Sequence, residues 1–229
     1  MQDKLVLGLD NSLDFLNLVL ARNDQLIEER HAKAEQHSSQ VLPDKVSQLL
    51  ADHGYTPKDV STLIVSLGPG SFTGVRVGLA FCKGMAEALG IPLIGVPTQD
   101  ILAQPFGFLA GYYLCPLIDA KKGEVFFALY RVEDGTVVRI DGFHALKPDQ
   151  LRDRVPEPCL CFGSGVKLCR SVLTAIEGVR LIEQGFDRVS GEALLRTGLA
   201  RRITNGHEDV APLYGRKSEA EIKFNITVS

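Results

Sequence analysis

Two aspartates stand where an α/β sheet commonly places carboxylates that bind ligands. Asp10 closes the apolar segment Leu5–Asp10, and Asp119 closes the segment Leu114–Asp119. Short apolar runs of this kind indicate buried strands, and ligands of open α/β sheets bind beyond the carboxyl ends of such strands. Carboxylates there could bind Mg²⁺ together with a nucleotide. A turn-capping role is the competing interpretation for each aspartate.

Three further residues complete this candidate ligand cleft. Ser12 follows Asp10 in a turn, and the turn Gly163-Ser164-Gly165 follows the apolar segment Cys159–Phe162. A glycine-rich turn after a strand could cradle a phosphate, although the same pattern is typical of a plain connection. The candidate cleft comprises Asp10, Ser12, Asp119, Gly163 and Gly165.

The most unusual segment is Gly68–Gly78, with glycines at positions 68, 70, 74 and 78. A Walker loop needs Gly-Lys after Gly and four further residues, and Lys83 is too far away. A dinucleotide fingerprint needs glycine where Thr73 stands, and a nucleophile elbow needs glycine two residues before Ser71, where Pro69 stands. The segment therefore predicts a strand–turn–helix junction with Ser71 or Thr73 as the N-cap.

The histidines and cysteines predict neither a metal site nor disulfide bonds. No two histidines have the i, i+4 spacing of a helical metal pair, and no Ser-His-Asp set can be assembled. The cysteines are odd in number and lack Cys-x₂-Cys spacing, which favours a reducing compartment. The residues concerned are His31, His37, His53, His144, His207, Cys82, Cys115, Cys159, Cys161 and Cys169.

Composition predicts a soluble chain that does not bind nucleic acid by itself. The 229 residues carry a formal net charge of −3, and 45% of them are hydrophobic. Proteins that bind nucleic acid alone are usually basic, so we expect any RNA contact to be weak, local or shared with a partner. No signal segment opens the sequence, and no apolar run reaches the ~18 residues of a membrane span. We therefore expect a cytoplasmic location without membrane contact.

The order of the predicted elements is that of a mixed sheet covered by helices. Residues 22–36 are rich in charged side chains, and this pattern predicts a solvated connection. A second series of strands begins near residue 110, so we predict an α/β chain of two related lobes, 1–109 and 110–229. The predicted strands are Leu5–Asp10, Leu16–Ala21, Thr62–Ser66, Ile91–Val96, Leu114–Asp119, Val125–Arg131, Val137–Asp141 and Cys159–Phe162. The predicted helices are Ser38–Asp52, Thr73–Leu89 and Thr98–Leu109.

The predicted helix Thr73–Leu89 carries a stripe of small residues. Glycine inside a helix costs roughly 0.5–1 kcal/mol relative to alanine, so its glycines indicate close approach by another backbone. Two interpretations stay open: packing on the protein's own sheet, or a helix–helix interface with another chain alongside Ser38–Asp52. The small residues are Gly74, Gly78, Ala80, Gly84 and Ala88.

Several segments resemble the TsaB (YeaZ) family of tRNA threonylcarbamoyladenosine biosynthesis proteins. The segments are Gly68–Gly78 with Gly90–Val96, His37-Ser38 before Leu42-Pro43, Asp119–Phe126, Pro212–Tyr214 and Ser218–Glu221. The sequence departs from the family at Asn11, where threonine is usual, and at Lys217, where proline is usual. The segment Pro97–Leu102 lacks the His-x-x-x-His that binds metal in the catalytic paralogue, TsaD.

The resemblance implies an actin-like (ASKHA, ribonuclease H-like) fold of two related lobes and a scaffold without catalytic or metal-binding residues. Such a subunit binds a TsaD-like catalytic subunit and, with it, a TsaE-like ATPase, in the complex that makes N6-threonylcarbamoyladenosine at position 37 of tRNA (t6A37). It also pairs with itself as a homodimer. No cofactor is implied, although the question whether a nucleotide binds at the interface of the complex stays open. By resemblance, the partner interface comprises His37, Leu42, Val46, Leu49, Leu50, Val75, Arg76, Gly78, Leu79, Lys83, Gly84, Ala86 and Glu87.

An independent enzyme is the alternative hypothesis. An actin-like kinase or hydrolase would use Asp10 and Asp119 with Mg-ATP. The turns of this sequence lack the Gly-Gly and Gly-Thr patterns of such phosphate loops. Tight binding of Mg-ATP by the isolated chain would favour this alternative.

Overall fold

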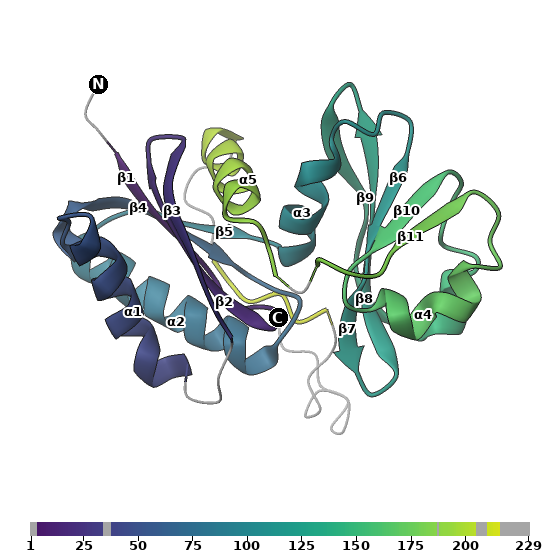
Figure 1. Cartoon of the computed structure of the whole chain (residues 1–229), viewed down its shortest axis with the longest axis horizontal. Helices are drawn as coiled ribbons and strands as arrows, with labels where there is room; N and C mark the ends of the chain where they lie inside the picture. The colour runs from purple at the N-terminus through teal and green to yellow at the C-terminus, as the bar shows by residue number, and fades with distance from the viewer. Residues whose placement is uncertain (1–3, 34–37, 187, 205–209, 216–229) are drawn as a thin grey trace. The chain divides into compact units, whose positions relative to one another are not determined.

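The computed structural model describes residues 4–33, 38–186, 188–204 and 210–215, and the chain forms two compact units (Figure 1). Unit 1 comprises Met1–Pro105 and Asp187–Pro212, and unit 2 comprises Phe106–Phe186 and Leu213–Ser229. The sequence analysis placed the lobe boundary after residue 109 and every later residue in the second lobe. The structure instead returns the last helix to unit 1, because that helix packs on the first sheet.

Unit 1 is built on a five-stranded sheet in the order β3-β2-β1-β4-β5. Strand β2 is antiparallel to β1 and β3, whereas β4 is parallel to both β1 and β5. All residues of β1 are buried, as expected for a central strand covered on both faces. The strands are β1 (Leu5–Asp10), β2 (Phe15–Arg22), β3 (Gln25–Lys33), β4 (Val60–Ser66) and β5 (Leu93–Val96).

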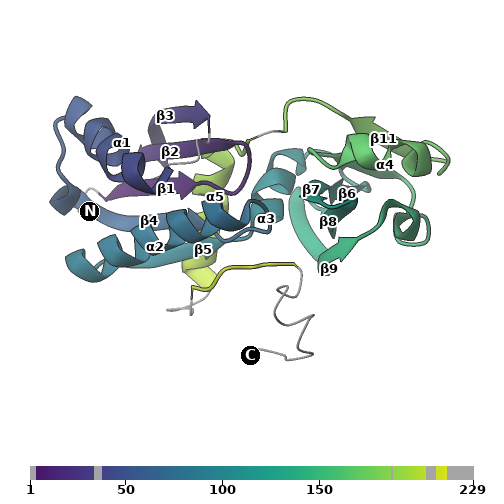
Figure 2. The same cartoon turned by 90° about the horizontal axis from the view of Figure 1, so that it is seen from below.

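Helices cover both faces of this sheet. The helices and 3-10 turns of unit 1 are α1 (Ser38–Asp52), η1 (Pro57–Asp59), α2 (Phe72–Leu89), α3 (Thr98–Ala103) and α5 (Gly191–Thr204). Helices α1 and α2 lie side by side on one face, and α5 lies on the other (Figures 1 and 2). The alternation of β1 explains this division: Leu9 contacts α2, and a side chain at Gly8 would meet Leu194 of α5.

The predicted bounds of the two neighbouring helices are confirmed almost to the residue. Helix α1 ends at Asp52, and Gly54 reverses the chain with φ of 74°, so that the Tyr55 amide donates to the Leu50 carbonyl at 2.9 Å. Helix α2 begins at Phe72, one residue earlier than predicted. Ser71 is its N-cap, and its hydroxyl accepts from the Gly74 amide at 3.2 Å.

The prediction of a solvated connection over residues 22–36 is wrong, because strand β3 occupies Gln25–Lys33. A tight turn at Asn23, with φ of 58°, folds β3 back onto β2. Strand β3 is the edge of its sheet, and its side chains are mostly half-buried or exposed. Charged residues suit such an edge because they prevent other strands from pairing with it. The charge density that argued against a strand is therefore a property of an edge strand.

Unit 2 contains a six-stranded sheet in the order β11-β10-β6-β8-β7, with β9 also paired to β8. Its strands are β6 (Tyr113–Pro116), β7 (Ile118–Lys121), β8 (Glu124–Glu133), β9 (Thr136–Leu146), β10 (Cys159–Phe162) and β11 (Val179–Ile182). The remaining elements are the 3-10 turns η2 (Gln104–Phe106), which begins at the end of unit 1, and η3 (Pro148–Leu151), and helix α4 (Val166–Leu173). The predicted strand Leu114–Asp119 is divided at Leu117, whose amide donates to the Phe162 carbonyl at 2.8 Å.

The core of unit 2 lies between its sheet and α4. It contains Phe127, Val166 and Leu173, together with every cysteine except Cys82. All five cysteines are buried free thiols. The predicted absence of disulfides therefore agrees with the structure, in which these side chains are small apolar core residues. None of the described helices has the length and apolar character needed to cross a bilayer.

Candidate functional site

An open groove lies on the surface of unit 1 between α1 and α2. Its volume is about 400 Å³, and its walls come from the two helices and the turn η1. Most of its lining side chains are apolar, so covering the groove would remove apolar surface from water. The lining residues are Pro43, Val46, Ser47, Pro57, Ala80, Phe81, Gly84 and Met85. We call this surface the α1–α2 groove.

The glycines of α2 fall into two groups. A Cβ at Gly74 would lie 2.0 Å from the carbonyl oxygen of Asn11, and a Cβ at Gly78 would lie 2.7 Å from Leu9 Cδ2. These glycines let α2 approach β1, so for them the first interpretation, packing on the protein's own sheet, is the one observed. A Cβ at Gly84 would meet nothing within 4 Å, because this residue opens into the groove.

Most residues of the predicted partner interface are buried in unit 1. The leucines and valines of the set are core residues of unit 1, with at most 5% of each side chain exposed, and Gly78 is buried as well. Their side chains pack beneath the two helices and leave little surface exposed to a partner. The buried members of the set are Leu42, Val46, Leu49, Leu50, Val75, Gly78 and Leu79. Of these, only Val46 also lines the groove.

The polar members of the predicted interface do lie at the surface. These are Arg76, Lys83 and Glu87, which are exposed on α2, whereas the apolar Ala86 is half-buried. The Arg76 guanidinium lies 3.7 Å from the centre of the Phe72 ring, which is 52% exposed. His37 lies outside the described residues. A partner role for the exposed residues stays a prediction.

The sequence analysis missed several groove residues that only the packing of the two helices defines. Pro43 and Ser47 are four residues apart on α1, and Phe81 and Met85 are four apart on α2. Residues at this spacing share one helix face. The signal was therefore present, but the stripe of buried leucines and valines dominates the pattern of α1. Pro57 comes from the turn η1 and carries no helical signal at all.

Asp10 and Ser12 form a buried polar cluster at the end of β1. The Ser12 hydroxyl and amide donate to Asp10 Oδ1 at 2.5 and 3.1 Å, and Thr98 Oγ1 donates to Ser12 Oγ at 2.9 Å. Asp10 Oδ2 has no hydrogen-bond partner among the described residues. Burial raises the pKa of Asp10 above its ordinary value, and the Ser12 and Ser66 hydroxyls offset this only in part.

The loop that leads into α2 closes over this cluster. The Ser71 amide donates to the Ser12 carbonyl at 2.7 Å, and a Cβ at Gly70 would lie 2.1 Å from the same oxygen. Asp10 and Ser12 are each 0% exposed. Asp10 and Ser12 therefore support the loop from inside the unit and have no exposed surface in this fold, and their role in a ligand cleft stays a prediction.

Asp119, Gly163 and Gly165 lie in unit 2 and come together at the break between β6 and β7. Asp119 Oδ1 accepts from the Lys121 amide at 2.7 Å, which is the turn-capping role. The Asp119 amide donates to Ser164 Oγ at 3.1 Å. A Cβ at Gly163, with φ of 110°, would lie 2.3 Å from the Leu117 carbonyl oxygen, and one at Gly165 would lie 2.8 Å from Val125 Cγ1. These glycines serve close backbone packing, and phosphate binding by this turn stays untested.

The described residues contain no group of three His, Cys, Asp or Glu side chains placed to share a metal ion. The histidines instead pair with single carboxylates, as His53 does with Glu28 at 2.6 Å and His144 with Asp141 at 2.9 Å. The exposed feature best suited to binding is thus the α1–α2 groove, an apolar surface flanked by charged helix residues.

Comparison with known proteins gives matches over most of the chain. The family model of TsaD, the tRNA N6-adenosine threonylcarbamoyltransferase, matches residues 30–157. The tRNA threonylcarbamoyladenosine biosynthesis protein TsaB of Bacillus subtilis (strain 168) is 30% identical over 233 residues, which cover 96% of this chain and 97% of the relative. TsaB of Escherichia coli (strain K12) is 29% identical over 154 residues, 66% of each protein.

Solved structures agree on the fold. The crystal structure of a Pseudomonas aeruginosa protein with similarity to peptidase YeaZ has a TM-score of 0.77 and 23% identity, covering 93% of this chain and all of the other. Together with the two mixed sheets, this likeness confirms the predicted actin-like α/β fold. The match to the Bacillus protein extends over nearly the whole of both sequences. The chain therefore belongs to the TsaB (YeaZ) family of tRNA threonylcarbamoyladenosine biosynthesis proteins.

Proposed function

We propose that this chain is a non-catalytic subunit of the machinery that makes t6A37, and that its α1–α2 groove binds a TsaD-like catalytic subunit. A role in t6A biosynthesis follows from the TsaB family. The observation that supports the groove as the binding surface is Gly84, a helix glycine with no intramolecular reason to lack a side chain. Its cost to the helix is explained if another backbone must approach there.

The choice of occupant rests on the shared family. The TsaD family model matches residues 30–157, a range that includes α1 and α2. A TsaD-like subunit is therefore expected to carry an equivalent helix pair, and two such pairs can pack with their small-residue faces together. A second copy of this chain could use the same surface, because identical patches are self-complementary in a two-fold dimer. The homodimer is thus the competing occupant that the experiment must exclude.

The remaining parts of the proposal follow from this assembly. A TsaE-like ATPase joins only when the pair has formed, and any nucleotide binds at the interface of the complex. Transfer to tRNA occurs on the catalytic subunit, and this chain contacts tRNA through the complex. The closed loop over Asp10 supports this division of labour, because the aspartate that a nucleotide-binding relative would use has no exposed surface here.

Gly84→Arg is expected to abolish co-purification with the TsaD-like subunit of the same organism while the chain stays folded. The arginine side chain would fill the groove, and space at the Cβ position means that the fold need not change. Affinity should fall by more than about tenfold, which corresponds to ~1.4 kcal/mol. Titration calorimetry of purified subunits measures the loss, and circular dichroism verifies the fold.

Ser171→Arg is the matched control, because it adds the same side chain to the exposed face of α4 in unit 2. Normal binding by Gly84→Arg would contradict the groove assignment. Sedimentation of this chain by itself, and then of its mixture with the catalytic subunit, separates the homodimer from the heterodimer. If the isolated chain instead bound Mg-ATP tightly and hydrolysed it, the independent-enzyme hypothesis would replace the scaffold.

A further inference from the structure

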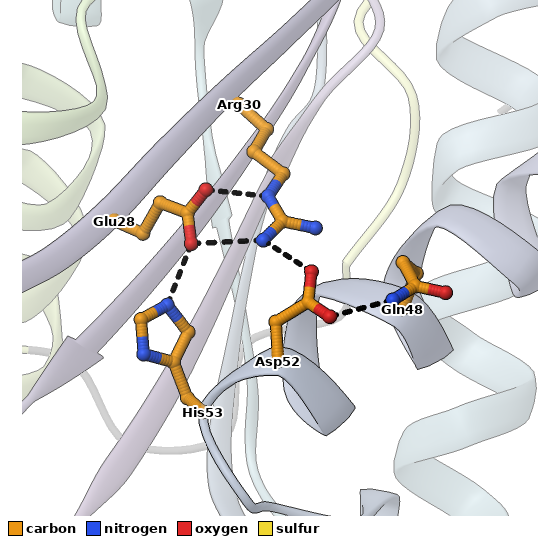
Figure 3. A network of polar contacts seen from close by, with 5 residues as sticks. All are labelled: Glu28, Arg30, Gln48, Asp52 and His53. Atoms are coloured by element: carbon orange, nitrogen blue, oxygen red, sulfur yellow. Dashed lines mark hydrogen bonds and ion pairs between the residues drawn. The ribbon is translucent and has the colours of Figure 1, made fainter.

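A network of charged side chains joins the edge strand β3 to the C-terminal end of α1 (Figure 3). Arg30 pairs with the carboxylate of Glu28 and with that of Asp52. Its Nε lies 2.5 Å from Glu28 Oε1, and its Nη2 lies 2.7 Å from Asp52 Oδ2. His53 Nε2 lies 2.6 Å from Glu28 Oε2, and Gln48 Nε2 donates to Asp52 Oδ1 at 2.6 Å. Arg30 thus supplies the positive charge that pairs with a carboxylate on each of the two elements.

Asp52 is in an unfavourable place for the helix by itself. It is the last residue of α1, and the C-terminal end of a helix dipole repels negative charge. The last turn contains no basic residue that could compensate. Asp52 therefore depends on Arg30 from another element. The low pKa of Asp52, caused first by the Arg30 hydrogen bond, shows that the pair favours the ionised carboxylate.

The hydrogen bonding within helix α1 is interrupted at one residue. Pro43 lies inside the helix and has no amide hydrogen to donate. The same residue forms part of the groove wall, together with Val46 and Ser47. Beyond the helix, Tyr55 is hydrogen-bonded to Arg22 of β2, so the sheet holds the turn after α1 at a second point. Displacement of α1 would move the groove wall directly.

We propose that Arg30 is a positioning residue that fixes α1 against β3 and thereby sets the groove for its partner. The inference rests on the proposed function for the identity of that partner, but not for the position of α1. Arg30 is not one of the residues that line the groove. Its effect on binding is therefore transmitted through the helix.

Arg30→Met, which keeps most of the aliphatic stem and removes the charge, is expected to weaken binding of the TsaD-like subunit about fivefold, the effect of a small network of exposed ion pairs. Arg30→Lys should bind with intermediate affinity, because lysine keeps the charge but cannot form two directed pairs. Asp52→Asn should weaken binding similarly, and Arg30→Met should add little to it, because both changes break the same pair. Calorimetry measures these affinities at low ionic strength.

Amide hydrogen exchange gives a readout that does not depend on the partner. In free Arg30→Met, the amides from Leu49 to Asp52 should exchange faster, whereas those of α2 should not change. Arg170→Met is the matched control, because Arg170 pairs with Glu183 at 2.5 Å on the surface of unit 2. It should alter neither binding nor exchange in α1.

The two measurements separate the two proposals. Unchanged exchange in α1, or wild-type affinity of Arg30→Met, would overturn the role of Arg30. If wild-type protein itself fails to bind the TsaD-like subunit, the proposed function is wrong, and the exchange of α1 still decides whether Arg30 fixes this helix. Raised salt should reduce the affinity of the wild type toward that of Arg30→Met, since ion pairs at the surface are screened.

Discussion

Gly74→Ala is expected to lower the free energy of unfolding of unit 1 by about 3 kcal/mol, at the upper end of the usual cost of overpacking. The new Cβ would lie 2.0 Å from the Asn11 carbonyl oxygen and 3.1 Å from Ser71 Oγ. Neither atom can withdraw easily. Asn11 is buried and donates its side-chain amide to the Gly74 carbonyl at 3.1 Å, and Ser71 is the N-cap of α2.

Two neighbouring glycines provide a graded series for this prediction. At Gly78 the obstructing atom is Cδ2 of Leu9, a side-chain atom, so Gly78→Ala should cost less than Gly74→Ala. At Gly84 there is open space, and Gly84→Ala should stabilise the chain by roughly 0.5–1 kcal/mol through better helix propensity. Urea unfolding monitored by circular dichroism measures all three. Equal stability of Gly74→Ala and Gly84→Ala would contradict the assignment of the two groups.

The same series shows why sequence spacing alone left two interpretations of the small-residue stripe. Gly74, Gly78 and Gly84 look equivalent in the sequence, because each is a small residue at helical spacing. Whether a side chain fits depends on which face of α2 meets β1, and this is decided by packing between elements that are distant in the chain. The periodicity of the sequence does not indicate that contact. The structure assigns the first interpretation to Gly74 and Gly78, whereas the second stays a proposal for Gly84.

The other elements also divide into those that local sequence signals predict and those that depend on contacts between distant parts of the chain. The helices and buried strands were predictable because caps and apolar periodicity are local signals, as Ser71 and Gly54 show. Strand β3 was not, because an edge strand needs no apolar face and its identity depends on pairing with β2. The leucines and valines of α1 were assigned to a partner interface, although the apolar stripe of a helix ordinarily faces its own core. The exposed opposite face, with Pro43 and Ser47, is where the groove lies.

Asp10→Asn is expected to stabilise the chain by about 1–3 kcal/mol at pH 7, the usual cost of a buried polar group without its partners. Asp10 is fully buried, and its Oδ2 has no partner among the described residues. Asparagine keeps the acceptor oxygen for the Ser12 amide and hydroxyl and removes the charge. Its side-chain NH₂ can donate toward Ser66, whose hydroxyl lies beside the carboxyl group.

The pH dependence of this effect has a definite sign. Burial raises the pKa of Asp10 in the folded chain above 3.8, the value for the unfolded chain. The folded state therefore keeps its proton over a pH range in which the unfolded state has lost it. The stability contributed by neutral Asp10 is complete below pH 3.8 and is lost as the pH rises through the raised pKa. The advantage of Asp10→Asn should be small at low pH and grow to a plateau at higher pH.

Asp59→Asn is the matched control because its expected slope is opposite. The Thr56 backbone amide and hydroxyl donate to Asp59 at 2.7 and 2.8 Å and lower its pKa, so its contribution exists above pH 3.8 and is lost as the pH falls. Urea unfolding of the three proteins across this pH range measures both slopes. A less stable Asp10→Asn at pH 7 would show that the ionised carboxylate is needed. In that case Asp10 would again be a candidate ligand for Mg-ATP. If the chain is a scaffold, only the hydrogen bonds from Ser12 to residue 10 are needed, and Asp10→Asn should bind the partner with unchanged affinity.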